Sequence, residues 1–305
     1  MESVEAAAAI EQAPAPDYVA IAAALGTVVV WASAFVGIRS AGHSFSPGAL
    51  SLGRLTVAVV ALGFVALVRR EPLPSRDALR EVGVPLLVCG LLWFGVYNVV
   101  LTSGERRVDA GTAAMLVNVG RILIAILAGL FLREGFPRSL FSGVAVAFVG
   151  VVVIAIASST HAATTNGVLL CLGAAAAYAA GVVTQKVVLR RLTPFQTVFG
   201  CAAIGAVVCT PFAPQLVRQL GEGHGGATGW IVYLGIAPTA LGFLMWTFAL
   251  SRTNAGRLAA TTYLVPPISV LLGWIWLGET PASLAYLGGA LCLAGVAVSR
   301  RRAKP

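Results

Sequence analysis

Charged residues are scarce in this 305-residue chain. They make up 11% of it, whereas soluble domains carry roughly 25%. Hydrophobic residues account for 58%, and the mean hydropathy is +0.89. This number of charges is too small to cover a water-facing surface. The apolar excess must therefore face lipid. The shortage excludes a soluble globular protein and predicts an all-α integral membrane protein.

Acids and histidines are missing from the apolar runs. All 12 acids fall in predicted tails, loops or run ends, and the three histidines fall in predicted loops. An enzyme acting within the membrane would need an acid pair, a metal cluster or a nucleophile with its base. The chain also lacks the GxxxxGK[ST] loop that cradles phosphates for ATP hydrolysis. We therefore expect neither an enzyme nor a bound metal or cofactor, and proton coupling is not indicated.

Paired cysteines and a secretory signal are also lacking. The five cysteines lie singly in apolar runs without a CxxC, which is typical of packing residues. Residues 1–17 carry four acids and no lysine or arginine, so they lack a basic n-region and are predicted to form a disordered cytoplasmic tail. The net charge of +9 comes from short clusters between apolar runs, which does not indicate a nucleic-acid partner.

Ten apolar runs are long enough to cross a bilayer, which takes about 20 residues. They cover 18–38, 47–68, 82–103, 109–132, 138–158, 166–188, 194–213, 229–250, 257–278 and 283–299. The breaks between them carry proline, glycine or charge, and the longest, around 215–229, reads as a glycine-rich loop. The sequence thus predicts ten transmembrane helices, followed by a basic cytoplasmic tail at 300–305.

Lysine and arginine set the predicted orientation. With a cytoplasmic N-terminus, 15 of the 21 basic residues fall on the cytoplasmic side and four on the other, leaving Arg54 and Arg121 within spans. Positive residues accumulate on the cytoplasmic side of membrane proteins. This favours an even number of spans, a multi-pass protein of the cell membrane, and both termini in the cytoplasm.

The second half of the chain repeats the first. At an offset of 145 residues, Gly90 matches Gly235, Glu134 matches Glu279 and Gly150 matches Gly295. An offset of 147 matches Pro47 to Pro194. The halves, 18–158 and 166–299, would each hold five spans. Because five is odd, the two repeats would be inverted, an arrangement found in transporters that bind substrate near the midplane.

The ordered motifs resemble those of the drug/metabolite transporter superfamily, EamA type. They are Trp31-Ala32-Ser33-Ala34-Phe35, Arg54, Leu132-Arg133-Glu134, Tyr263-Leu264-Val265-Pro266-Pro267 and Leu277-Gly278-Glu279. The resemblance covers about residues 18–300. It implies a bundle of two inverted five-helix repeats that transports amino acids, related metabolites or drugs, most often outward. In the first half, Arg121 stands 13 residues before Glu134, where the second half has Pro266 before Glu279.

Arg121 is the leading candidate for a substrate contact. A charge at the bilayer centre costs at least ~2.5–3.5 kcal/mol and usually faces a cavity or a partner. Asn118 shares its helix face, and we expect the pair to contact an anionic group, most simply a carboxylate. Arg54, two turns into its span, has a structural or a substrate-binding role with equal support. The alternative for Arg121 is that it bonds backbone carbonyls of neighbouring helices, and a structural Arg54 would reach the interface or bond a carbonyl.

Aromatic and amide side chains supply a candidate lining for the pocket, in which aromatic walls surround a few polar groups. The candidates are Trp31, Trp93, Asn98, Tyr178 and Tyr263. Prolines inside apolar runs interrupt helical hydrogen bonding and are candidate hinges or static kinks. They are Pro238, Pro266 and Pro267. Glu134 and Glu279 are expected to anchor a helix end in each repeat.

The predicted function is a secondary transporter of a small metabolite, with export favoured by the resemblance. A lipid flippase and a membrane enzyme acting on lipid-linked substrates are the alternatives. An enclosed polar cavity would favour the metabolite transporter, and an apolar lateral opening would favour the flippase. The expected partners are a small-molecule substrate and the bilayer, and the sequence leaves a homodimer open.

Overall fold

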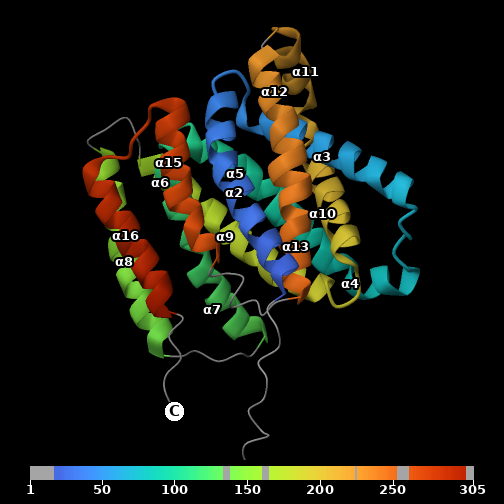
Figure 1. Ribbon diagram of the computed structural model, residues 1–305, viewed down its shortest axis with the longest axis horizontal. Coiled ribbons are helices and arrows are strands. Elements are labelled where there is room, and N and C mark those ends of the chain that lie inside the picture. The colour runs from blue at the N-terminus through green and yellow to red at the C-terminus, as the bar shows by residue number, and fades with distance from the viewer. Residues whose placement is uncertain (1–16, 133–137, 160–164, 224, 253–260, 300–305) are drawn as a thin grey trace, which may run out of the picture.

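The computed structural model describes residues 17–132, 138–159, 165–223, 225–252 and 261–299, and every regular element within them is a helix (Figure 1). Residues 1–16 of the predicted tail at 1–17, the predicted tail at 300–305, and Glu134 lie outside these residues. The first half contains α2 (Tyr18–Ala41), α3 (Pro47–Arg69), α4 (Arg76–Cys89), η1 (Gly90–Val96), α5 (Tyr97–Glu105), α6 (Ala110–Asn118), α7 (Gly120–Leu132) and α8 (Arg138–Ser159). The second half contains α9 (Thr165–Val188), α10 (Pro194–Val208), η2 (Thr210–Phe212), α11 (Ala213–Gly221), α12 (Gly225–Leu234), η3 (Gly235–Leu241), α13 (Gly242–Arg252), η4 (Thr262–Leu264), α15 (Val265–Leu277) and α16 (Ser283–Ser299).

Local sequence fixes where the helices begin. The side chain of Asp17 accepts a hydrogen bond from the backbone N–H of Ala20 at 3.0 Å and caps α2. The helices α3 and α10 both start with a hydroxyl N-cap followed by proline, Ser46-Pro47 and Thr193-Pro194. Such a cap bonds an otherwise unpaired backbone N–H, and proline fits the first helical position because it has no N–H to lose.

The helix boundaries recur with the offsets found in the sequence. The ends of α2 and α9 differ by 147 residues, and those of α7 and α15 differ by 145. The two π-helices η1 and η3 also match at 145. The packing is reciprocal as well: α10 of the second repeat packs on η1 of the first, and its counterpart α3 packs on η3 of the second. The chain is therefore built from two structurally matched repeats that pack reciprocally.

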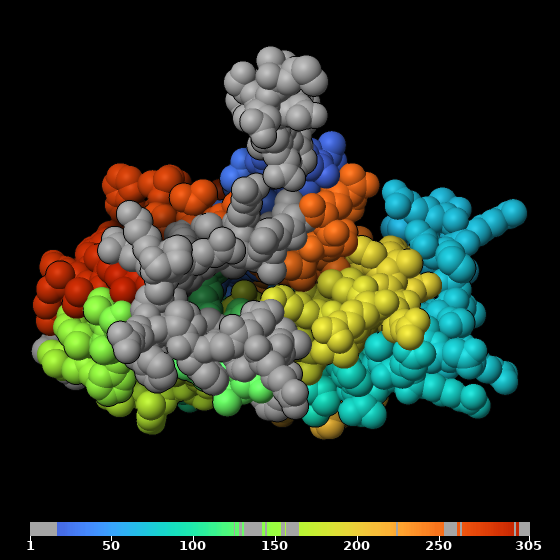
Figure 2. Space-filling model, turned by 90° about the horizontal axis from the view of Figure 1, so that it is seen from below, coloured from blue at the N-terminus to red at the C-terminus, as the bar shows by residue number. Residues whose placement is uncertain are grey.

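The pair α8 and α16 stands apart from the other helices (Figure 1). Figure 2 shows this pair at one edge of the molecule and the α3–α4 connection at the opposite edge. The crossing of α8 with α16 depends on two glycines at matched positions of the two repeats. A Cβ on Gly150 would lie 2.6 Å from the carbonyl oxygen of Gly288, and one on Gly295 would lie 2.5 Å from the backbone nitrogen of Ala147. The two backbones thus approach closely, as small residues allow in membrane helices.

Five helical segments are long and apolar enough to cross a membrane: Tyr18–Ala41, Pro47–Arg69, Arg76–Glu105, Thr165–Val188 and Gly225–Arg252. A sixth arises if Pro194–Val208 and Thr210–Gly221, which meet at a 50° bend, form one span. Shorter apolar helical stretches cover Ala110–Ile124, Val265–Leu277 and Ser283–Gly295. The predicted fourth span, for example, is divided at Val119 between α6 and α7.

The sequence-based prediction was wrong for the segment around 215–229. A helix, α11, covers Ala213–Gly221, and α12 starts at Gly225. All side chains of α11 are at least partly exposed, and its apolar residues lie on one face. Composition suggested a loop because a nine-residue amphipathic helix rich in polar residues has a low average hydropathy. The glycines that prompted that prediction cluster at its end.

We expect Gly150→Ala to destabilise the protein by about 1–3 kcal/mol, because the new methyl group would push apart two backbones in contact. Thermal unfolding in detergent would measure the change. Gly173→Ala in α9 is the matched control, since its Cβ would meet only Val100 at 3.7 Å. Equal melting temperatures for the two variants would contradict the assigned crossing.

Candidate functional site

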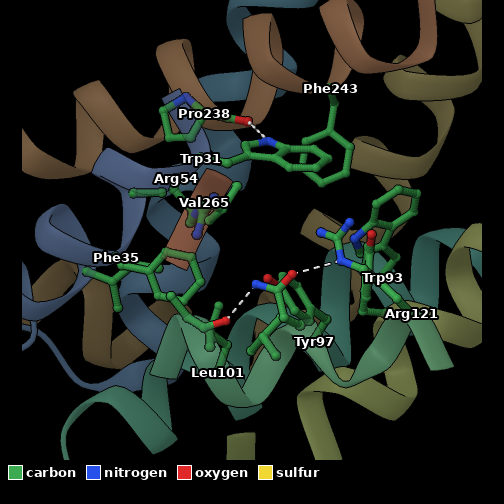
Figure 3. Close-up of a pocket in the computed structure, with 16 residues that line it drawn as sticks. Trp31, Phe35, Arg54, Trp93, Tyr97, Leu101, Arg121, Pro238, Phe243 and Val265 are labelled. Atoms are coloured by element: carbon green, nitrogen blue, oxygen red, sulfur yellow. Dashed lines mark hydrogen bonds between the residues drawn. The ribbon is translucent and has the colours of Figure 1, made fainter. Parts of the chain in front are cut away.

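A central cavity lies between the two repeats. Residues of α2, α3, η1, α5, α6, α7 and α9 line it together with residues of η3, α13 and α15. It encloses about 640 Å³ of empty space, counting its open mouth. Figure 3 shows side chains from both repeats facing this space. Two guanidinium groups and one amide are among the lining residues, none of which is a carboxylic acid. The lining therefore combines apolar walls with positive charge.

Arg121 is oriented by Asn118, across the break in the fourth predicted span. Its Nε donates to Asn118 Oδ1 at 2.8 Å, and Asn118 Nδ2 donates to the carbonyl oxygen of Ala114 at 2.9 Å (Figure 3). Asn118 ends α6, and Arg121 lies in the first turn of α7. The break thus persists without the proline found at the matching place in the second repeat. Both side chains line the cavity, as the sequence predicted of a shared face.

Arg54 connects the first repeat to the π-helix of the second. It is 4% exposed, and its Nε and Nη2 donate to Thr239 Oγ1 at 3.0 and 2.9 Å. The hydroxyl of Thr239 in turn donates to the carbonyl oxygen of Leu234 at 2.7 Å. Arg54 also lines the cavity. It therefore holds η3 in place and contributes positive charge to the site.

Four aromatic rings form a continuous wall across the repeats. The ring of Phe243 lies 5.3 Å from that of Trp31 and 5.0 Å from that of Trp93, and Trp93 lies 5.3 Å from Tyr178. Trp31 and Tyr178 are matched positions, 147 residues apart. Edge-to-face contacts of this kind fix ring orientations beyond what apolar burial alone provides. The wall is consequently a rigid surface.

The π-helices release backbone carbonyls that side chains then bind. Trp31 Nε1 donates to the carbonyl oxygen of Pro238 in η3 at 3.2 Å (Figure 3). In η1, the carbonyl oxygen of Phe94 accepts from Asn98 Nδ2 at 2.6 Å. A π-turn shifts the hydrogen-bond register, and lipid offers no replacement partner. The indole and the amide therefore stabilise η3 and η1.

Six of the eight predicted binding residues line the cavity: Arg121, Asn118, Arg54, Trp31, Trp93 and Tyr178. Asn98 does not; it is buried, and its amide bonds the backbone of η1. Tyr263 lies in η4, and its side chain is outside the described residues.

The predicted hinge residues fall at two irregular places. Pro238 lies within η3 and lines the cavity, whereas Pro266 and Pro267 occupy the first turn of α15, just after the 3₁₀ turn η4. Proline in the first turn leaves the helix beyond it intact. The helix α15 therefore starts at Val265, and the two prolines in its first turn do not interrupt it.

Sequence reasoning missed Phe243, Tyr97 and Glu105. Phe243 and Tyr97 line the cavity. The 145-residue offset places Phe243 opposite the candidate Asn98, which is a signal that could have found it. Glu105 follows the predicted run at 82–103, yet it is the last residue of α5 and is fully buried. Glu105 thus lies at the end of an apolar run, as the sequence predicted of the acids, but its burial was not predicted.

The other glutamate near a helix end makes an interrepeat ion pair. Arg39 Nε, at the end of α2, lies 2.8 Å from Glu279 Oε1, just after α15. Arg39 Nη1 also donates to the carbonyl oxygen of Glu105 at 2.7 Å. Arg39 thus joins α2 to the end of α5 and to the segment after α15, which agrees with an anchoring role for Glu279.

Comparison with known proteins identifies relatives over almost the whole chain. The profile of the EamA-like transporter family matches residues 18–156 and 165–301. A probable terminal-alkyne amino-acid exporter of Streptantibioticus cattleyicolor is 38% identical and is aligned over 90% of this chain and 91% of its own. A probable amino-acid metabolite efflux pump of Salmonella typhimurium is 28% identical over 90% and 93%. A protein of known crystal structure, 19% identical, shares the fold with a TM-score of 0.64 over 92% of this chain and 97% of its own.

We expect Thr239→Val to lower the free energy of unfolding by about 1.5–3 kcal/mol, because it removes the acceptor of two bonds from a buried guanidinium. Thr239→Ser keeps the hydroxyl and is the control. Thermal unfolding in detergent would compare them. A valine variant as stable as the serine variant would show that Arg54 does not depend on this contact.

Proposed function

Since the chain belongs to the EamA-like transporter family, we propose that it exports an amino acid or a closely related small metabolite across the cell membrane by alternating access. It is a multi-pass membrane transporter and not an enzyme. The observation that carries the proposal is the interrepeat cavity, where two arginines and an asparagine meet an aromatic wall.

The proposed substrate carries a carboxylate that binds Arg121. A guanidinium binds carboxylates with charge-assisted hydrogen bonds, and Asn118 already orients this one. The ammonium group would lie against the aromatic wall, since ring faces attract cations. The names of the two relatives support this choice, because both mention amino acids or their metabolites. A cavity lined by two guanidinium groups, an amide and two phenol groups also supports a metabolite over a lipid.

The proposed topology has ten transmembrane helices in two inverted five-helix repeats, with both termini in the cytoplasm. The recurring helix boundaries and the reciprocal packing of α3 on η3 and α10 on η1 support it. The distribution of lysine and arginine supports the orientation. In this orientation the Arg39–Glu279 ion pair lies on the outer side, because α2 would leave the cytoplasm at Tyr18.

Alternating access would proceed by rearrangement at the irregular places of the helices. Residues at helix ends and breaks absorb dihedral changes most easily. We propose Pro238 in η3 and Pro266-Pro267 at the start of α15 as these places. All three belong to the second repeat, and their counterparts in the first are η1 and the start of α7 after the break at Val119.

A ligand-binding experiment tests the substrate class. We expect L-propargylglycine, a terminal-alkyne amino acid, to raise the melting temperature of the detergent-solubilised protein, because a ligand that binds the native state stabilises it. Homopropargylamine, which lacks the carboxylate, should not. In Arg121→Ala the affinity should fall about tenfold to a hundredfold, equivalent to the loss of one charged hydrogen bond of about 1.5–3 kcal/mol.

Arg190→Ala, at an exposed position, is the matched control and should bind as the unmodified protein does. Counterflow of labelled amino acid into proteoliposomes checks transport with the same variants. Stabilisation only by lipids or lipophilic cations would replace the proposal with the flippase alternative or with cation export. Normal binding of the amino acid by Arg121→Ala would contradict the assignment of Arg121 as the partner of the substrate carboxylate.

A further inference from the structure

The carboxyl group of Glu105 is buried and has no hydrogen-bond partner among the described residues. Glu105 is 0% exposed, and neither Oε1 nor Oε2 is bonded to any residue that the structure describes. It ends α5, one helical turn beyond Leu101, which lines the central cavity. The negative end of the helix dipole lies at this terminus and disfavours an anion there. The site is therefore unsuited to a carboxylate in this conformation.

The surroundings of Glu105 connect the cavity to the interrepeat ion pair. The charged and titratable groups that interact electrostatically with it are Arg39 of α2, Arg54 of α3, Tyr97 of α5, Cys171 of α9 and Glu279 after α15. From α6, the N-cap Asp109 has its carboxylate engaged by the backbone N–H and hydroxyl of Thr112 at 2.8 and 2.6 Å. The sequence of η1 has no titratable side chain.

The two arginines around Glu105 are engaged elsewhere. Arg54 directs Nε and Nη2 to Thr239, and Arg39 directs Nε to Glu279 and Nη1 to the backbone of Glu105. An ionised carboxylate buried without a bonded partner is strongly disfavoured, and such a group takes up a proton instead. The closed arrangement thus accommodates the neutral acid. Ionisation needs either water or a free arginine.

Opening the outer side would supply both. Separating Arg39 from Glu279 frees a guanidinium whose Nη1 already touches the Glu105 backbone, and it admits water to the end of α5. From the opposite direction, Arg54 both lines the cavity and interacts electrostatically with Glu105, so water entering the cavity would meet its guanidinium. Opening toward either side would thus involve a different arginine beside Glu105.

We propose that Glu105 is the proton-binding site that couples export to proton entry. The inference rests on the proposed exporter function. The acid takes a proton from water on the outer side after substrate leaves, forming its O–H bond, and the ion pair then closes over the neutral group. When the cavity opens to the cytoplasm, the O–H bond breaks, the proton passes to water, and the carboxylate is balanced by Arg54. One proton enters for each cycle.

Transport by Glu105→Gln in proteoliposomes tests the coupling. Glutamine imitates the neutral acid, so we expect L-propargylglycine counterflow, which needs no net proton movement, to continue. Accumulation driven by a pH gradient should be lost. Glu81→Gln is the matched control, because Glu81 is half exposed and pairs with Arg191 at the surface. Gradient-driven accumulation that survives in Glu105→Gln, or equal loss of both activities in a folded variant, would overturn the proposal.

Infrared spectroscopy gives a readout that does not depend on the substrate. The unmodified protein should show the carbonyl-stretch band of a protonated carboxylic acid, which disappears as the pH rises and is absent from Glu105→Gln. Glu105→Asp keeps an acid in a shorter side chain and should shift the midpoint, which decides the matter if the glutamine variant does not fold. If the carbonyl-stretch band is unchanged in these variants, Glu105 is not the protonated acid and the proposal is wrong. Absence of any counterflow by the unmodified protein, with the band present, refutes the exporter proposal alone.

Discussion

Every backbone polar group at membrane depth must find its partner inside the protein, and this requirement organises the centre of the molecule. At η1 and η3 the helical register shifts, and carbonyls lose their regular donors. The amide of Asn98 and the indole of Trp31 replace those donors. Thr239 binds the carbonyl of Leu234 while its oxygen accepts two bonds from Arg54. The positions of these side chains follow from the register shifts, and the cavity takes its walls from the same residues.

The two repeats have matching helix boundaries, but they differ in where they carry charged residues. Arg54 has Cys201 at the matched position 147 residues later, and Arg121 has Pro266 at an offset of 145. Both guanidinium groups of the cavity therefore come from the first repeat, whereas aromatic residues come from both. Backbone symmetry is what an exchange between two related conformations requires. A single orientation for bound substrate requires the opposite, an asymmetric set of polar groups. The structure satisfies both demands by confining the charges to one repeat.

Sequence alone placed apolar helices at most of the positions where the structure has them, and it found several polar cavity residues, although it missed α11. A charge inside an apolar run is conspicuous, so Arg54, Arg121 and Asn118 were found and do line the cavity. Phe243 was missed because aromatic residues are common in such runs and helix rotation is poorly defined by a nearly uniform apolar surface. Asn98 was assigned to the cavity because a π-turn, which directs its amide to the backbone, has no signature in hydropathy. Glu105 was missed because burial at a helix end depends on neighbouring helices.

Arg54 is the residue at which these features meet. It lines the cavity, it bonds Thr239 in the π-helix of the opposite repeat, and it interacts electrostatically with Glu105. An anion that enters the cavity, or a carboxylate that forms at Glu105, competes with the neutral hydroxyl of Thr239 for this one guanidinium. A charged acceptor binds a guanidinium more strongly than a neutral one. Under the proposed mechanism, either event would weaken the hold of α3 on η3. Because η3 contains Pro238 and carries the carbonyl bound by Trp31, the change of charge would act on an irregular helical segment.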